Sequence, residues 1–94
     1  MTVLMVSTAP DRPSYDKVAG IVDLVADRPA GLVLHASSEL PDGSVQIVDV
    51  WESAEHAEAF GRDRIFPAFA AAGVLEQMTN QPPPVPYATI DLVR

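Results

Sequence analysis

The sequence predicts an α+β fold of the ferredoxin-like kind, with elements in the order β-α-β-β-α-β. Strand-like apolar runs lie at residues 2–8, 31–38, 44–52 and 87–94. Helical periodicity separates the first two runs and returns after the third, and a Pro-Asp-Gly turn joins the middle two. This order gives a four-stranded antiparallel sheet with both helices on one face. The other face would be apolar and bare, so we expect a homodimer that stacks two sheets into a dimeric α/β barrel.

The first helix is predicted after the strand at 2–8. Asp11 or Ser14 can cap it, and Pro13 is acceptable in a first turn. We expect the helix to continue until Arg28-Pro29, because its apolar positions recur at helical spacing: Tyr15, Val18, Val22 and Val25.

The hairpin formed by residues 31–52 is specific enough to predict its register. A three-residue loop, Pro41-Asp42-Gly43, places Leu40 opposite Ser44. Counting outward pairs His35 with Asp49 and Val33 with Trp51. Alternation then predicts a plain core face and a second face that gathers the polar residues. The first comprises Leu32, Leu34, Ala36, Val48 and Val50, and the second Val33, His35, Ser37, Ile47, Asp49 and Trp51.

The second half of the chain is predicted to be helical and then extended. Ser53 is a good N-cap for a helix from residue 54 to about 61. A further helical stretch at about 64–72 ends at Gly73, and Pro67 near its first turn predicts two separate pieces. Residues 80–86, NQPPPVP, predict a polyproline-like connector to the last strand, 87–94.

Composition excludes several function classes. Ninety-four residues predict one domain, 1–94, and the absence of cysteine rules out disulfides and thiolate metal sites. The formal net charge of −7 disfavours nucleic acid and anionic membranes, which need basic surfaces. No apolar run could span a bilayer, and the N-terminus lacks a basic leader, so a cytoplasmic protein is expected. A small neutral or aromatic ligand, or another protein chain, is the expected partner.

The His35–Asp49 pair carries the chemistry that the sequence suggests. A carboxylate beside an imidazole fixes its tautomer and raises its basicity, so that the free nitrogen can exchange a proton with a ligand. The alternative is a hydrogen bond that lets two polar groups be buried.

Residues 49–60, DVWESAEHAEAF, resemble the antibiotic biosynthesis monooxygenase-like group of dimeric α/β-barrel proteins. The resemblance implies a homodimer with a pocket in each subunit between sheet and helices. Members of the group include cofactor-free oxygenases of aromatic polyketides and quinols, and related barrels act as polyketide cyclases. Trp51 matches the tryptophan that lines their pocket, and Ser53 their helix-capping serine. Their usual histidine farther along the second helix has no counterpart at residues 61–66, GRDRIF.

Other side chains are weaker candidates. Phe60, Phe66 and Tyr87 are expected to bind substrate, although the phenylalanines serve equally as core. His56, among glutamates at a helix start, is expected to be solvated. Arg62 and Arg64 are surface ion-pair residues, or bind an acidic group. No metal site is expected, because His35, Asp49 and His56 match no ligand motif.

These observations predict an enzyme similar to the cofactor-independent monooxygenases. His35, oriented by Asp49, would abstract a proton from an aromatic or polyketide-type molecule without a metal or organic cofactor. A cyclase or isomerase on the same fold is one alternative. A non-catalytic ligand-binding or assembly protein, with side chains filling the space around Trp51, is the other.

Overall fold

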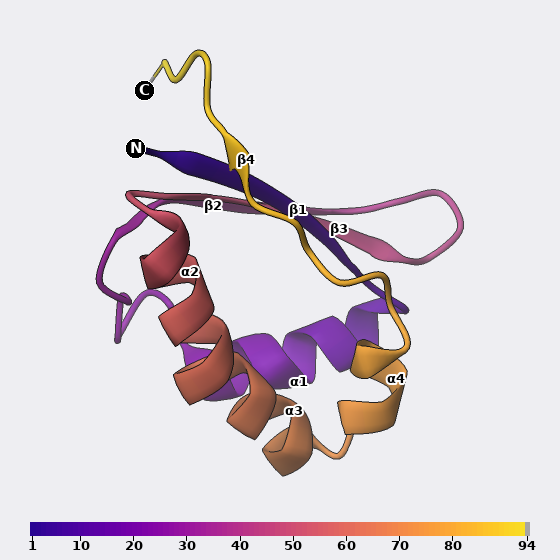
Figure 1. The fold of residues 1–94 in the computed structure, drawn as a ribbon. Coiled ribbons are helices and arrows are strands. Elements are labelled where there is room, and N and C mark those ends of the chain that lie inside the picture. Colours follow the sequence, from indigo (N-terminus) through magenta and orange to yellow (C-terminus); the bar gives the residue numbers. More distant parts are fainter. Residues whose placement is uncertain (94) are drawn as a thin grey trace.

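The computed structural model describes residues 1–93, which form one antiparallel sheet with helices on a single face (Figure 1). The strands lie in the order β2-β3-β1-β4, which confirms the ferredoxin-like prediction. The elements along the chain are β1 (Val3–Ala9), α1 (Arg12–Val22), β2 (Leu32–Glu39), β3 (Val45–Trp51), α2 (Ala54–Phe60), a π-helical turn η1 (Gly61–Ile65), α3 (Phe66–Ala72), α4 (Leu75–Thr79) and β4 (Tyr87–Ala88).

The β2–β3 hairpin has the predicted register around the loop. The Leu40 N–H donates to the Ser44 carbonyl at 2.8 Å, and Gly43 adopts φ +89°. His35 lies opposite Asp49, as expected. Leu34 lies opposite Val50, also as expected from the count. The predicted Val33–Trp51 pair is wrong, because a bulge at Val33 places Leu32 opposite Trp51.

Arg28 provides the physical reason for this bulge. Its Nη2 donates to the carbonyl of Leu32 at 2.8 Å and to that of Val33 at 3.0 Å. Both carbonyls thereby keep a hydrogen-bond partner where the ladder is interrupted. The bulge turns Leu32 onto the helix-covered face, where it packs with Trp51.

Helix α1 begins as predicted and ends earlier than predicted. The Asp11 carboxylate accepts from the Ser14 N–H at 2.8 Å. Asp23 turns left-handed at φ 48°, and its side chain accepts from the Ala26 N–H, so the helix stops at Val22. Val25 is therefore fully exposed instead of apolar core, and Leu24 packs against the core in its place.

The segment from α2 to α3 is one continuous helical run and not two pieces. Pro67 has no N–H and its ring crowds the preceding turn. The chain accommodates it with the wider η1 turn, in which the Phe66 N–H reaches the Gly61 carbonyl. Helix α4 was not predicted; it buries Met78 and follows Gly73, which ends α3 at φ 73°.

The last strand is much shorter than the predicted 87–94. Only Tyr87 and Ala88 pair with β1, followed by one bond from the Thr89 N–H to Thr2. Arg94, the end of the predicted strand, lies outside the described residues.

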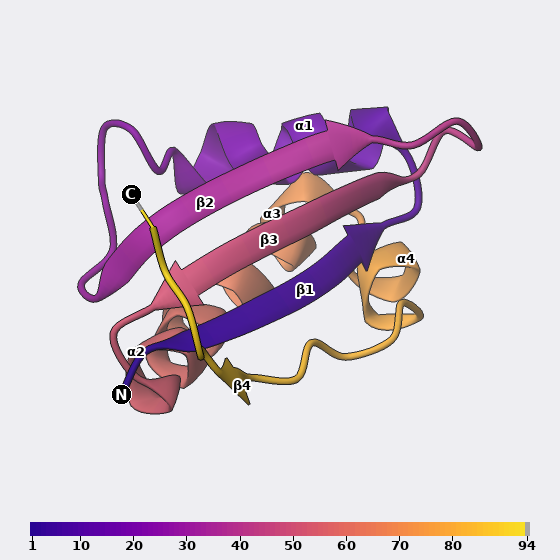
Figure 2. The ribbon, with the colours of Figure 1, turned by 90° about the horizontal axis from the view of Figure 1, so that it is seen from above.

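The helices cover the sheet face that was predicted to gather the polar residues, although Leu32 and Val50 of the predicted core set are buried, at 8% and 1% exposed. Helices cover the face of β3 that carries Val45, Asp49 and Trp51. The face predicted to be plain core looks away from them (Figure 2), and Leu34 on it is 48% exposed. None of the described helices is long and apolar enough to cross a membrane; a cytoplasmic location stays a prediction.

Candidate active site

A cavity of about 890 Å³ lies between the sheet and the helices. Its volume is within the range of pockets that hold drug-sized molecules. Strand, helix and connector residues all contribute to its walls. The polar and aromatic side chains in these walls include Tyr15, His35, Asp49, Trp51, Phe60 and Phe66.

The His35–Asp49 pair lies on the sheet wall of this cavity. The two residues are directly opposite each other on β2 and β3, and Nδ1 of His35 is 2.6 Å from Oδ1 of Asp49. Their side chains are 26% and 21% exposed, so both are largely shielded from solvent. An ionised carboxylate only accepts hydrogen bonds, so Nδ1 of His35 carries the proton and Nε2 of the neutral ring is a hydrogen-bond acceptor.

Aromatic side chains form the wall beside this pair. Trp51 is 2% exposed at the end of β3, and its ring lies 5.1 Å from that of Phe60 at a tilt of 41°. The guanidinium of Arg64 lies over the Phe60 ring, with its Cζ atom 5.4 Å from the ring centroid. Phe66 lines the cavity while 53% exposed, which places it toward the solvent.

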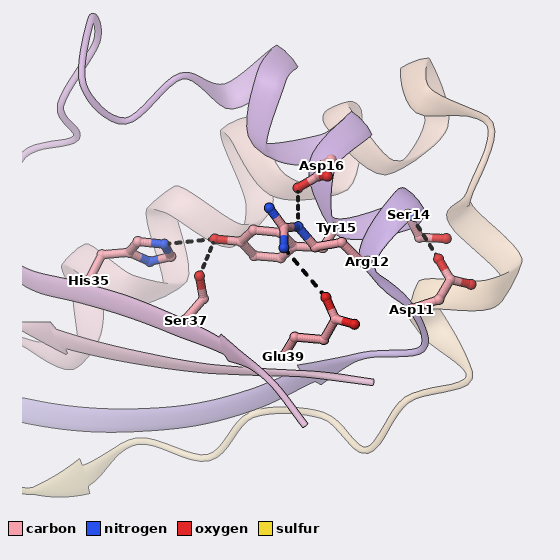
Figure 3. A network of polar contacts seen from close by, with 8 residues as sticks. All are labelled: Asp11, Arg12, Ser14, Tyr15, Asp16, His35, Ser37 and Glu39. Atoms are coloured by element: carbon pink, nitrogen blue, oxygen red, sulfur yellow. Dashed lines mark hydrogen bonds and ion pairs between the residues drawn. The ribbon is translucent and has the colours of Figure 1, made fainter. Parts of the chain in front are cut away.

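Tyr15 was predicted only as an apolar, core-facing position of the first helix. From α1 its hydroxyl lies 3.1 Å from Nε2 of His35 and accepts from the Ser37 hydroxyl at 2.8 Å (Figure 3). The result is a chain of hydrogen bonds through Ser37, Tyr15, His35 and Asp49. Its sequence signal was weak, because a tyrosine at helical spacing with valines is typical of a core position.

The proline-rich connector also forms part of the cavity wall. Thr8 on β1 donates to the side-chain oxygen of Gln81 at 2.8 Å, which holds the start of the connector against the sheet. Pro82, Pro83, Pro84 and Pro86 then line the cavity. The sequence predicted the extended conformation but no role in the site.

Other predicted candidates lie elsewhere. Tyr87 is 64% exposed on β4 and does not line the cavity, because its strand lies at the sheet edge. Ser53 caps α2 and contacts Nδ1 of His56 at 2.7 Å, outside the cavity. Among residues 1–93, no three histidine or carboxylate side chains cluster as a metal would need.

The charged groups at the cavity are mostly acidic. Asp23, Asp49 and Glu58 line it, together with Arg62. Arg62 donates to both carboxylate oxygens of Asp63, at 2.8 and 3.1 Å, and this hydrogen bonding lowers the pKa of the Asp63 carboxyl. Its positive charge is therefore largely compensated before any ligand arrives.

Solved structures of other proteins share this architecture. A Chloroflexus aurantiacus protein assigned to the antibiotic biosynthesis monooxygenases superimposes with a TM-score of 0.71 at 14% identity, covering 100% of this chain and 98% of that one. The ActVA-Orf6 monooxygenase of Streptomyces coelicolor, solved with nanaomycin D, gives 0.67 at 21% identity, covering 98% and 90%. The chain has the fold of the antibiotic biosynthesis monooxygenases. This confirms the resemblance seen in the sequence at the level of fold.

A third match extends the comparison to a named cofactor-independent enzyme. SnoaB, a cofactor-independent oxygenase of Streptomyces nogalater, shares the monooxygenase fold with a TM-score of 0.60 at 17% identity, covering 98% of this chain and 95% of SnoaB. No model of a protein family matches the sequence, and no curated protein does. The likeness to these enzymes is therefore one of fold, and the cavity is the feature that bears on activity.

Proposed function

We propose that the protein is a cofactor-independent monooxygenase-like enzyme that acts on an aromatic or polyketide-type small molecule. The observation that carries the proposal is the His35–Asp49 hydrogen bond on the wall of a large cavity beside Trp51. The pair assists removal of a proton from an acidic hydroxyl or activated carbon of the substrate. The resulting phenolate or carbanion then reacts with O2, one oxygen atom of which enters the product while the other leaves as water.

The residues that line the cavity favour an aromatic substrate. Phe60 and Phe66 line the cavity and keep ring surface exposed, on which a planar molecule can stack, while the buried Trp51 packs against Phe60. Prolines of the connector add an apolar wall without backbone donors. A space of about 890 Å³ is too large for the site to be a filled core, and this disfavours the non-catalytic assembly protein predicted as an alternative.

The charges support an uncharged substrate. Three carboxylates line the cavity, and its Arg62 is already paired with Asp63. An anionic ligand would meet repulsion that no free cation among the described lining residues offsets. A neutral phenol or quinol avoids this cost, and it becomes an anion only beside the proton acceptor.

A homodimer belongs to the same proposal. The helix-free sheet face carries half-exposed apolar side chains, including Val6 (42%) and Leu34 (48%). Two such faces stacked about a twofold axis would remove both from water. The two cavities would then lie on the outer sides of the paired sheets, each within its own subunit.

Oxygen uptake with an anthrone-type substrate tests the proposed function. We expect the wild-type protein to consume O2 in proportion to product, and to keep doing so after dialysis against a chelator. His35→Ala should lower kcat by about 10²-fold or more, the usual range for a lost general acid–base group.

The other outcomes of this assay separate the alternatives. Product without O2 uptake would make the protein a cyclase or isomerase that uses the same proton abstraction. Tight binding without any product would favour a ligand-binding protein. Full turnover by His35→Ala would contradict the role of the pair in every version of the proposal.

A further inference from the structure

Both ring nitrogens of His35 are already engaged within the protein. Nδ1 faces Asp49 at 2.6 Å, and Nε2 faces the Tyr15 hydroxyl at 3.1 Å. The imidazole has no third polar atom with which to contact a substrate. A ligand proton can reach His35 only through the group that occupies Nε2.

The proton arrangement follows from the donors and acceptors available. With Nδ1–H donated to Asp49, Nε2 accepts, so the Tyr15 hydroxyl must be its donor. The Ser37 hydroxyl then donates to the phenol oxygen at 2.8 Å. The phenol oxygen of Tyr15 keeps one unused lone pair. Tyr15 lines the cavity, whereas Ser37 does not. Figure 3 shows the Tyr15 hydroxyl between His35 and Ser37.

We propose that Tyr15 is the catalytic residue that meets the substrate, and that His35 and Asp49 act through it. This inference rests on the proposed function, since it names the group that carries out the proton abstraction. His35 and Asp49 become positioning and proton-accepting residues behind the phenol.

The proton transfer is a concerted relay of two protons that conserves atoms and charge. The Tyr15 O–H bond breaks as its proton passes to Nε2 of His35, and the phenol oxygen takes the substrate proton in concert. The electron pair of the broken substrate bond stays on the substrate, which becomes an anion. Tyr15 ends neutral and His35 ends as an imidazolium beside the Asp49 carboxylate. The Ser37 hydroxyl stabilises the negative charge that develops on the phenol oxygen.

A measurement without substrate tests the hydrogen-bond chain itself. The chain has two histidines, so ¹⁵N-labelled protein and a His56→Gln variant identify the His35 ring signals. We expect a protonated Nδ1 and an unprotonated Nε2, and Tyr15→Phe should shift the Nε2 resonance by removing its donor. A ring protonated on Nε2, or an Nε2 signal that Tyr15→Phe leaves unmoved, would overturn the relay.

Turnover tests the catalytic role of the phenol. On a substrate that the wild type converts, Tyr15→Phe should lower kcat by about 10²-fold or more. The Tyr15→Phe, His35→Gln double variant should be no slower than the slower single variant, because the two residues act as a unit. Quenching of Trp51 fluorescence should show an unchanged substrate Kd.

Tyr87 provides the matched control, because it is the second of two tyrosines and lies outside the cavity. Tyr87→Phe should keep full turnover. Full turnover by Tyr15→Phe would overturn the inference while leaving the proposed function intact. A wild type without turnover would instead count against the proposed function, and the ring signals would still decide whether the relay exists.

Discussion

Gly31 lies just before β2 and packs against His56 in the first turn of α2. It adopts φ +82°, and its carbonyl accepts from the Glu52 N–H at 2.8 Å. A Cβ at this position would lie 2.4 Å from Cγ of His56. The close approach of this backbone to His56 therefore depends on the missing side chain. It also explains why His56, expected to be solvated, is only partly exposed.

Gly31→Ala should destabilise the protein more than Gly43→Ala. Both glycines have positive φ, which costs about 1–2 kcal/mol for an alanine. Gly43 has open space around it, whereas Gly31 would add a clash with His56. Urea unfolding of the two variants measures the difference, and equal losses in the free energy of unfolding would refute the close approach.

The sequence predicted one half of the proton chain and missed the other. The His35–Asp49 contact follows from counting outward from a loop whose length Pro41 and Gly43 restrict, so it needs only local information. The Tyr15–His35 contact joins a helix to a strand across the interior. No short-range pattern specifies how a helix is rotated over a sheet, so that contact becomes visible only in three dimensions.

Helix α1 is the element that delivers Tyr15 to the site, and its start is secured by Asp11. The Ser14 N–H donates to the Asp11 carboxylate and lowers the pKa of Asp11. A carboxyl whose pKa is lower in the folded than in the unfolded state stabilises the fold above its ordinary pKa. That contribution is lost as the pH falls through the folded-state value.

Asp11→Ala should consequently destabilise the protein most near neutral pH. The difference in free energy of unfolding between wild type and variant should shrink below about pH 4, where the carboxyl becomes protonated. Chemical unfolding followed by circular dichroism at several pH values measures it. Asp42, whose pKa is also lowered, is common to both proteins, so its contribution cancels. A difference that stays constant down to pH 2 would be evidence against the cap.

Element ends and irregularities were the least predictable features at this scale. The bulge at Val33 depends on Arg28, whose guanidinium reaches two carbonyls from a preceding loop. The π turn depends on how Pro67 is accommodated within a longer helical run. Alternation and helical spacing describe regular elements, so neither feature has a signature in those patterns.

At the scale of the whole molecule, the helix-free face of the sheet is the feature that the isolated chain leaves unsatisfied. Its apolar side chains were predicted to form the core, because alternation alone does not tell which face the helices cover. The four-stranded antiparallel sheet and the one-sided helices were predicted correctly from the order of elements. Burial of this face requires a second copy in our proposal.

Leu34→Asp should therefore shift the protein from dimer to monomer. A carboxylate on the stacked face would be buried without a partner, which costs several kcal/mol per site. Val25→Asp is the control, because Val25 is fully exposed away from the sheet. Sedimentation should give twice the monomer mass for wild type and Val25→Asp. A monomeric wild type at micromolar concentration would contradict the dimer.

The central claim is that Asp49 and His35 drive proton abstraction in the cavity, and Asp49→Asn tests it most directly. The asparagine side chain has the shape of the aspartate, but it lacks the negative charge that holds the proton on Nδ1 of His35. The measurement is kcat for wild type and Asp49→Asn on the same aromatic substrate, with the substrate Kd from Trp51 fluorescence. We expect Asp49→Asn to lower kcat by about 10²-fold or more at an unchanged Kd. Equal kcat values in the two proteins would contradict the role of the His35–Asp49 pair.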